Sequence, residues 1–421
     1  MNDEGGEIAV HSTLRTPHSA LRTSMPFPIP QEFRFAGVYS GVKRDTSRLD
    51  CALVVSDVPA VAAGVYTKNL VFAAPVAWDR ARTPGTGFRA VAINSGNANA
   101  CTGERGLRDA QRMAEVAARL CDAPAEAGLV LSTGVIGEYL PLNKIAAGLQ
   151  TCGQALDRTE AAFINAARGM MTTDTVHKVA GRTLSLANRT LTIAGMCKGA
   201  AMIAPNMGTM LGLVLTDASF EPGAAQQSLS AVVEQTFNCI SVDGHMSTND
   251  TVLLVANGAA GGPSLAGADL KQFEDSLLAV CRDLSRAIPA DGEGATHLIT
   301  IEVTGCRTRA DARQIAKSVA DSPLVKCAIH GADPNWGRIV SAAGYSGVQF
   351  DAKQVILKLN GFLLFSDAAP VSFDAGQVSA SIRDNHETLI QLEFAEGGEA
   401  ITFYTADLSA EYVRLNADYH T

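Results

Sequence analysis

The chain has 421 residues, of which 47% are hydrophobic and 18% charged, a composition typical of water-soluble globular proteins. The 34 Lys and Arg residues stand against 43 Asp and Glu residues, so the net charge is −9. The sequence contains no run of basic residues, which argues against a nucleic-acid partner or an anionic membrane. No apolar run approaches the ~20 residues of a membrane-spanning helix.

The first segment lacks the pattern of a folded element. The hexapeptide at residues 11–16, "HSTLRT", returns almost unchanged at residues 18–23, as low-complexity sequence does. The continuous apolar core of a secretory signal is missing. Met25 lies two residues after the repeat and offers an alternative start. We therefore expect residues 1–31 to form a disordered tail and the protein to be cytoplasmic.

From residue 32 onward, strand-like and helix-like patterns alternate. Short β-branched runs bounded by turn residues predict buried strands in "CALVVSDV", "AVAINSG", "HLITIEVTG" and "VILKLNGFLLF", which begin at Cys51, Ala90, His297 and Val355. Apolar residues at steps of three and four predict two helices, one through Leu107, Ala110, Met113, Ala117 and Leu120, the other through Leu270, Phe273, Leu277, Cys281, Leu284 and Ile288. The fold class is therefore α/β or α+β with substantial sheet, and no long linker divides it.

Polar, glycine-rich loops recur along the chain: "NSGNANACTG", "STGVIG", "MTTDT", "SVDGHMSTNDT", "DGEGATH", "HGADPNWGR" and "LNADYHT". None has the spacing of a phosphate loop, a dinucleotide-binding turn or a serine nucleophile elbow. The eight histidines do not cluster: His177, His245, His297 and His330 lie in separate loops, so a metal site is not indicated. The nine cysteines form no CxxC pair and are expected to be small apolar filler.

One loop places a polar residue directly against an apolar run. In "KGAAMIAPNMGTMLGLVL", residues 198–215, Thr209 follows Gly208 and precedes a strand-like sequence. On pattern alone, Thr209 is best explained as the first residue of a buried strand. The alternative is chemical: cleavage between Gly208 and Thr209 would free an α-amine, whose pKa near 7.7–8.0 suits it to serve as the base for the threonine hydroxyl.

The loops together favour the chemical alternative. "KGAAMIAPNMGTML", "NSGNANACTG", "STGVIG", "MTTDT", "STNDT", "GEGAT", "DPNWGRI" and "YVRLNADYHT" resemble, in order, the ornithine acetyltransferase (glutamate N-acetyltransferase) family of arginine biosynthesis. The resemblance covers residues 32–421. It implies a layered α/β sandwich around paired mixed sheets, similar to that of self-processing aminopeptidases. It also implies self-cleavage into an alpha chain, residues 32–208, and a beta chain, residues 209–421.

The resemblance assigns roles residue by residue. Thr209 corresponds to the nucleophile, and Thr133 and Gly134 correspond to the oxyanion hole. The positions that hold the amino-acid substrate in that family correspond to Thr172, Lys198, Thr209, Glu293, Asn416 and Thr421. Charge fits these roles, because a lysine can neutralise an α-carboxylate and a glutamate can bind a cationic amine.

The expected reaction is ping-pong transfer of an acetyl group from N-acetylornithine to glutamate through an acetyl-threonine ester, with release of ornithine. No cofactor or metal is expected, and acetyl-CoA is left open as a second acetyl donor. The resemblance also implies a heterotetramer of two alpha and two beta chains. Two alternatives stay open: a self-processed amidase or aminopeptidase with an N-terminal threonine, and a non-catalytic relative. Gly208 departs from the family, which usually has alanine there.

Overall fold

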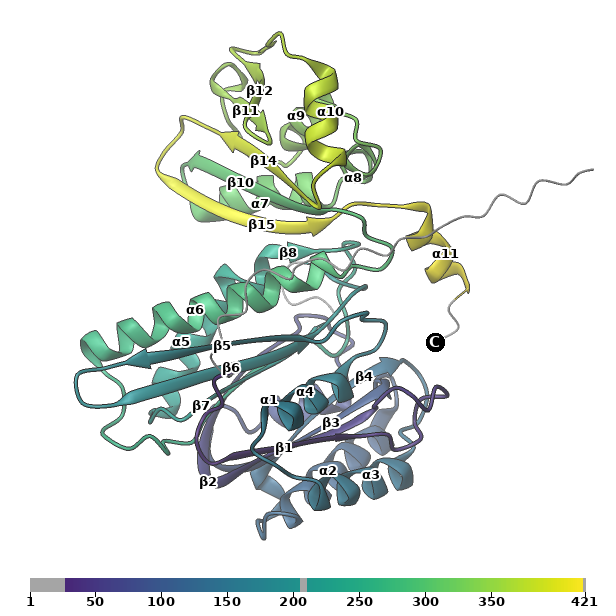
Figure 1. Ribbon diagram of the computed structural model, residues 1–421, viewed down its shortest axis with the longest axis vertical. Coiled ribbons are helices and arrows are strands. Elements are labelled where there is room, and N and C mark those ends of the chain that lie inside the picture. The colour runs from purple at the N-terminus through teal and green to yellow at the C-terminus, as the bar shows by residue number, and fades with distance from the viewer. Residues whose placement is uncertain (1–26, 205–209, 419–421) are drawn as a thin grey trace, which may run out of the picture.

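The computed structural model describes residues 27–204 and 210–418 of the chain (Figure 1). Two mixed β-sheets with helices packed on them form two lobes, so the predicted α/β sandwich is confirmed. Gly208, Thr209 and Thr421, which the sequence singled out, lie outside the described residues, as does most of the predicted tail. Within the described ranges, no helix combines the length and the apolar character that crossing a membrane requires.

The first sheet contains eight strands. Seven follow the order β4-β3-β2-β9-β7-β6-β5, and β1 pairs with β2. The pairs β3–β4 and β7–β9 are parallel, and the other pairs are antiparallel. The strands are β1 (Phe33–Val38), β2 (Cys51–Tyr66), β3 (Gly85–Asn97), β4 (Gly128–Val135), β5 (Lys178–Ser185), β6 (Thr190–Lys198), β7 (Leu211–Thr216) and β9 (Thr251–Ala256).

Helices cover both faces of this sheet because the strands are apolar on both sides. In β2, Val54 packs beneath α4, whereas its neighbours Leu53 and Val55 pack under α1, α2 and α3. The helices α5 and α6 pack against β6, β7 and β9. The bounds are α1 (Ala74–Arg80), α2 (Gly103–Arg119), α3 (Leu142–Gln154), α4 (Glu160–Met170), α5 (Pro222–Gln235) and α6 (Gly267–Ala290).

The second sheet forms the upper lobe of Figure 1, in the order β13-β12-β11-β14-β10-β15-β8. Its strands are β8 (Ile240–Ser241), β10 (Leu298–Cys306), β11 (Ile356–Leu359), β12 (Phe362–Ser366), β13 (Ala369–Pro370), β14 (Glu387–Glu393) and β15 (Glu399–Ala406). The remaining helices are α7 (Arg309–Ala320), α8 (Pro323–His330), α9 (Trp336–Gly344), α10 (Ala375–Arg383) and α11 (Ala410–Asp418). Short 3-10 turns occur at Ala125–Ala127, Phe237–Cys239 and Ala352–Gln354.

The two lobes share part of one hydrophobic core. Ile288 of α6 belongs to the same buried cluster as Leu298 of β10 and Tyr404 and Ala406 of β15. In Figure 1, α6 accordingly lies between the first sheet and β15. The loop that connects α6 to β10 is therefore held at the junction of the two lobes.

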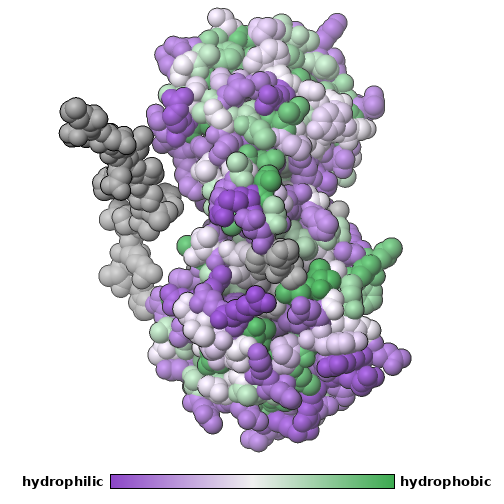
Figure 2. Space-filling model, turned by 90° about the vertical axis from the view of Figure 1, so that its right-hand side faces the viewer, coloured by the Kyte–Doolittle hydropathy of each residue, from purple (hydrophilic) through white to green (hydrophobic). Residues whose placement is uncertain are grey.

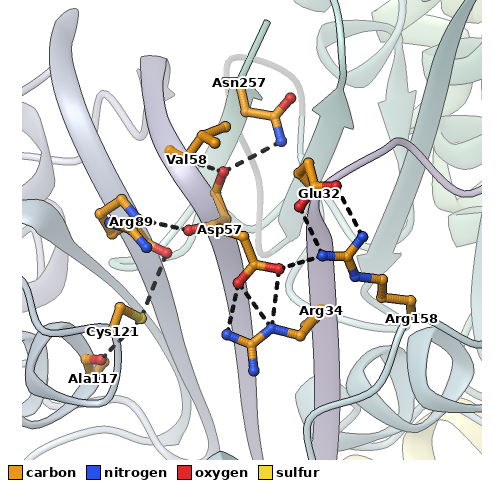
Figure 3. Close-up of polar contacts among 10 residues, drawn as sticks. Glu32, Arg34, Asp57, Val58, Arg89, Ala117, Cys121, Arg158 and Asn257 are labelled. Atoms are coloured by element: carbon orange, nitrogen blue, oxygen red, sulfur yellow. Dashed lines mark hydrogen bonds and ion pairs between the residues drawn. The ribbon is translucent and has the colours of Figure 1, made fainter. Parts of the chain in front are cut away.

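An ion cluster fixes the first described strand. Asp57 accepts hydrogen bonds from Arg34 on β1 at 2.6 Å and from Arg158, before α4, at 2.7 Å. Arg158 also binds Glu32 at 2.7 Å. Figure 3 shows the Asp57 carboxylate between the two guanidinium groups. The side chains are partly exposed, so each pair contributes about 0–1 kcal/mol, and the network mainly sets the position of β1.

Most predicted elements are confirmed, with two corrections. The segment from Val355 is not one strand but a hairpin, β11 and β12, which turns at Asn360 and Gly361 with φ of 48° and 84°. This Asn-Gly pair suits the two positive φ angles of a tight hairpin turn. On α2, Leu107 is 47% exposed rather than part of the buried face. All nine cysteines are free thiols, and seven are buried, which agrees with their predicted role as apolar filler.

Candidate functional site

A cavity of ≈ 410 Å³ lies beside the ends of β4 and β6. Every predicted site residue within the described ranges lines it: Thr133, Gly134, Thr172, Lys198, Glu293 and Asn416. The other lining residues are Ala98, Ile136, Thr173, Ala201, Met202, Asp243, His245, Ser247, Thr248, Asn249 and Tyr412. Figure 2 shows the side of the molecule that carries α11, with a waist between the two lobes. Six residues spread over 284 positions of sequence thus meet at one cavity.

The end of β4 supplies Thr133 and Gly134. Gly134 has φ of +133°, and a Cβ there would lie 2.2 Å from the backbone carbon of Gly96 on β3, so glycine alone fits. The amide of Asn249 holds this strand end in place by donating to the carbonyls of Ser132 at 2.8 Å and Ala98 at 2.7 Å. The Thr133 hydroxyl and the Gly134 backbone are therefore fixed before any ligand arrives.

Lys198 ends β6, and only 2% of its surface is exposed. Its ammonium donates to Thr133 Oγ1 at 3.3 Å, the one hydrogen bond that it makes to a described residue. Burial lowers the pKa of Lys198, and the nearby Asp174 carboxylate partly offsets that effect. An ammonium has three donors, so two remain for an anionic ligand in the cavity.

Glu293 and Asn416 contact each other in the lining of the cavity. Asn416 on α11 donates through Nδ2 to Glu293 Oε2 at 2.8 Å, and the Glu293 amide donates to the Ala200 carbonyl at 2.8 Å. The hydroxyl of Tyr412, also on α11, donates to Asp243 Oδ2 at 3.1 Å. In Figure 1, α11 descends from the second sheet toward the level of the first. Both lobes therefore contribute to the cavity.

One buried acid beside this site was not singled out from the sequence. Asp250 is fully buried directly before β9, and its Oδ1 accepts from the Met210 amide at 2.9 Å. Burial raises the pKa of Asp250 well above its usual range. Its Oδ2 has no hydrogen-bond partner among the described residues. Met210 directly follows the predicted nucleophile, Thr209, in the sequence. Its place in "STNDT" was the available signal.

The histidines are less dispersed than the sequence indicates. His297 and His330 both contact Thr296 Oγ1, through Nδ1 atoms at 2.8 Å and 3.2 Å. His330 also bonds to buried Asp407 at 2.7 Å. The prediction of separate positions is wrong for this pair, since α8 brings His330 back beside the start of β10. The cluster anchors the loop after Glu293, and neither histidine lines the cavity.

Comparisons with known proteins show to which family the chain belongs. The ArgJ family model matches residues 34–421. The chain is 45% identical over 396 residues to the arginine biosynthesis bifunctional protein ArgJ of Rhodopirellula baltica, covering 93% of this chain and 96% of that protein. It is 44% identical over 395 residues to the protein of the same name from Symbiobacterium thermophilum, covering 93% and 98%.

Two solved structures are also similar. The crystal structure of ArgJ from Bacillus halodurans is 38% identical and covers 48% of this chain and 96% of that chain, with a TM-score of 0.47. The ornithine acetyltransferase of Mycobacterium tuberculosis, solved in complex with ornithine, is 37% identical and covers 42% and 95%, with a TM-score of 0.38. The family match over nearly the whole chain and the relatives above 40% identity establish that this chain belongs to the ArgJ family.

Proposed function

We propose that this chain cleaves itself before Thr209 and then transfers an acetyl group from N-acetylornithine to glutamate through an ester on Thr209, as an enzyme of arginine biosynthesis. The observation that carries the proposal is the convergence of Thr133, Gly134, Lys198 and Glu293 on one cavity. Family membership supports it, since the relatives are named for arginine biosynthesis. One of the solved relatives holds ornithine.

The charges in the cavity fit a zwitterionic α-amino acid. The Lys198 ammonium is placed to bind a carboxylate, and the Glu293 carboxylate is placed to bind a cationic amine. The acyl donor and the acyl acceptor both carry an α-carboxylate, so one cavity can bind them in turn. Sequential binding at a single site is compatible with a ping-pong mechanism, in which the acyl group stays on the enzyme between the two half-reactions.

Self-cleavage begins when Thr209 Oγ attacks the Gly208 carbonyl carbon and the peptide bond shifts to an ester. Water then hydrolyses that ester, leaving a carboxylate on Gly208 and a free α-amine on Thr209. In the transfer reaction, this amine takes the hydroxyl proton as Oγ attacks the acetyl carbonyl, and it returns a proton to the departing amine of ornithine. The amine of glutamate then attacks the acetyl ester, forms N-acetylglutamate and restores the hydroxyl.

The sheet explains how two chains would stay together. β7 of residues 209–421 pairs on one side with β6 of residues 1–208, and β9 pairs with β2. Cleavage between 208 and 209 would leave both of these strand pairs in the middle of the first sheet. We therefore propose that the two chains form one unit. The assembly of two such units into a heterotetramer stays a prediction.

Incubating the cleaved protein with N-acetylornithine alone should add one acetyl group to the 209–421 chain, detected by intact-mass spectrometry. Subsequent addition of glutamate should remove that group and yield N-acetylglutamate. A parallel reaction with acetyl-CoA in place of N-acetylornithine tests whether it is a second acetyl donor. Release of free acetate at one rate with or without glutamate would instead identify an amidase, and absence of any acetylated chain would reject both.

Replacing Thr133 by valine should lower the rate of acetylation about 10²- to 10³-fold, because the oxyanion would lose a hydroxyl donor. The KM should change little, since this donor acts mainly in the transition state. Thr388→Val is the matched control. Thr388 is fully buried in the second sheet, and its hydroxyl has no partner among the described residues. Single-turnover rates for both variants check the prediction, and equal rates would remove Thr133 from the oxyanion hole.

A further inference from the structure

Three proposed substrate contacts come from three separate segments. Thr172 follows α4, Lys198 ends β6, and Glu293 follows α6. Close to all three lies a buried ion triplet formed by Lys178, Asp174 and Asp291. None of these three residues lines the cavity.

The three charged groups of the triplet lie close together and are almost fully buried. Lys178 Nζ donates to Asp174 Oδ1 at 2.7 Å and to Asp291 Oδ2 at 2.5 Å. The exposed fractions of the three side chains are 1%, 0% and 8% for Lys178, Asp174 and Asp291. A pair with so little solvent is screened weakly, and loss of one member leaves an uncompensated buried charge.

Asp174 fixes the backbone beside two of the substrate contacts. Its Oδ2 accepts from the Thr172 amide at 2.9 Å, and its Oδ1 accepts from the Gly199 amide at 2.7 Å. Gly199 follows Lys198 directly, so this bond sets where the ammonium-bearing strand end lies. Hydrogen bonds to an ionised carboxylate are the stronger kind, and two from different segments bring those segments into register.

Asp291 links the third segment, which carries Glu293, to the segment of Thr172. Its Oδ2 accepts from the Thr175 amide at 3.1 Å, and the Thr175 hydroxyl also donates to its Oδ1. Two residues further along, the Glu293 amide donates to the carbonyl of Ala200, close to Lys198 in sequence. The carboxylates of Asp174 and Asp291 thus connect all three segments, and Lys178 joins the two carboxylates.

Opposite charges in this group offset the cost of burying each one. Burial alone would raise the pKa of Asp174, but the Lys178 and Lys198 ammonium groups hold it well below its usual range. Burial alone would lower the pKa of Lys178, but Asp174 and Asp291 raise it. Lys178 and its two aspartates therefore stabilise one another in their charged forms.

We propose that Lys178 is a positioning residue for the amino-acid site: by joining Asp174 to Asp291, it fixes the segments of Thr172, Lys198 and Glu293 relative to one another. The proposal rests on the proposed function, which assigns those three residues to the substrate. It follows that Lys178 controls how tightly N-acetylornithine and glutamate bind, although it touches neither. Misplacement of binding groups by about 1 Å is enough to cost about 100-fold in rate.

The test is Lys178→Met, which keeps an unbranched side chain, one atom shorter, and removes the charge. We expect kcat/KM for N-acetylornithine to fall about 100-fold, mainly through a higher KM, because binding to substrate and transition state weakens together. Calorimetry should show an equal rise in the Kd of ornithine. Asp291→Asn keeps the contact between Lys178 and Asp174, so its KM should rise in the same direction by a smaller factor. This second variant carries the test if Lys178→Met does not fold.

Two controls separate positioning from stability. Arg182 lies on the same strand as Lys178 and forms an exposed ion pair with Asp283. Arg182→Met removes this pair and should leave KM unchanged. Ile390→Ala opens a cavity in the remote second sheet and should lower the Tm without raising KM. A Lys178→Met protein that loses Tm but keeps the wild-type KM and ornithine Kd would overturn the proposal. Failure of the wild-type protein to transfer acetyl groups would instead count against the proposed function, because ornithine binding is measured independently.

Discussion

Thr209→Ala should run as one polypeptide of 421 residues and should be inactive, whereas the wild-type protein should run as two chains divided after Gly208. Alanine lacks the hydroxyl that would attack the Gly208 carbonyl, so neither the cleavage nor the acetyl ester can form. The transfer rate should fall by about 10⁴-fold or more, as it does when an essential nucleophile is removed. Intact-mass measurement and the N-acetylornithine assay check the two parts separately.

Two companion variants sharpen this result. Thr209→Ser keeps a hydroxyl and a chain-terminal amine, so it should still divide and should retain measurable transfer. Gly208→Ala restores the residue that the family usually has before the nucleophile, and it should divide at least as completely as the wild-type protein. A single chain of Thr209→Ala that transfers acetyl groups at the wild-type rate would reject the mechanism, because the proposed base would not exist.

The sequence predicts the individual helices and strands of this fold better than it predicts which strands pair with one another. The apolar faces of α2 and α6 follow from spacing alone, because a helix face repeats every 3.6 residues. The hairpin at Asn360 was missed because its two strands are short and equally apolar, so they read as one run. The sheet order could not be predicted, since β2 lies between β3 and β9 through contacts nearly 200 residues apart. Long-range pairing leaves no periodic signal in a single sequence.

The residues that line the candidate site could be predicted from the sequence, but the residues that position them could not. Motif resemblance located six of the described residues that line the cavity, and they lie in or next to the ends of strands and helices. It did not locate the residues that hold them. Lys178 is four residues from Asp174 but 113 from Asp291, and neither spacing indicates a shared ion pair. Asp250 was missed for the same reason: its importance comes from burial beside Met210, which a sequence does not show.

The cation at Lys198 has the second large expected effect. Lys198→Met should lower kcat/KM for N-acetylornithine by about 30- to 4,000-fold, corresponding to the 2–5 kcal/mol typical of breaking a buried charge pair. The loss should appear largely as a higher KM, because the carboxylate is bound in the ground state and in the transition state alike. Lys358→Met removes a half-exposed ion pair with Glu393 in the second sheet and should leave the kinetics unchanged.

The pH dependence gives this prediction a second, independent measurement. Burial lowers the pKa of Lys198, so its ammonium loses a proton at a lower pH than an exposed lysine does. As the pH rises through that lowered pKa, the substrate carboxylate loses its cationic partner, and KM should therefore climb on the alkaline side. Lys198→Met has no proton to lose there, so its KM should be high at every pH and should lack the alkaline rise. An alkaline rise of unchanged size in Lys198→Met would show that a different group binds the carboxylate, and it would remove Lys198 from the substrate site.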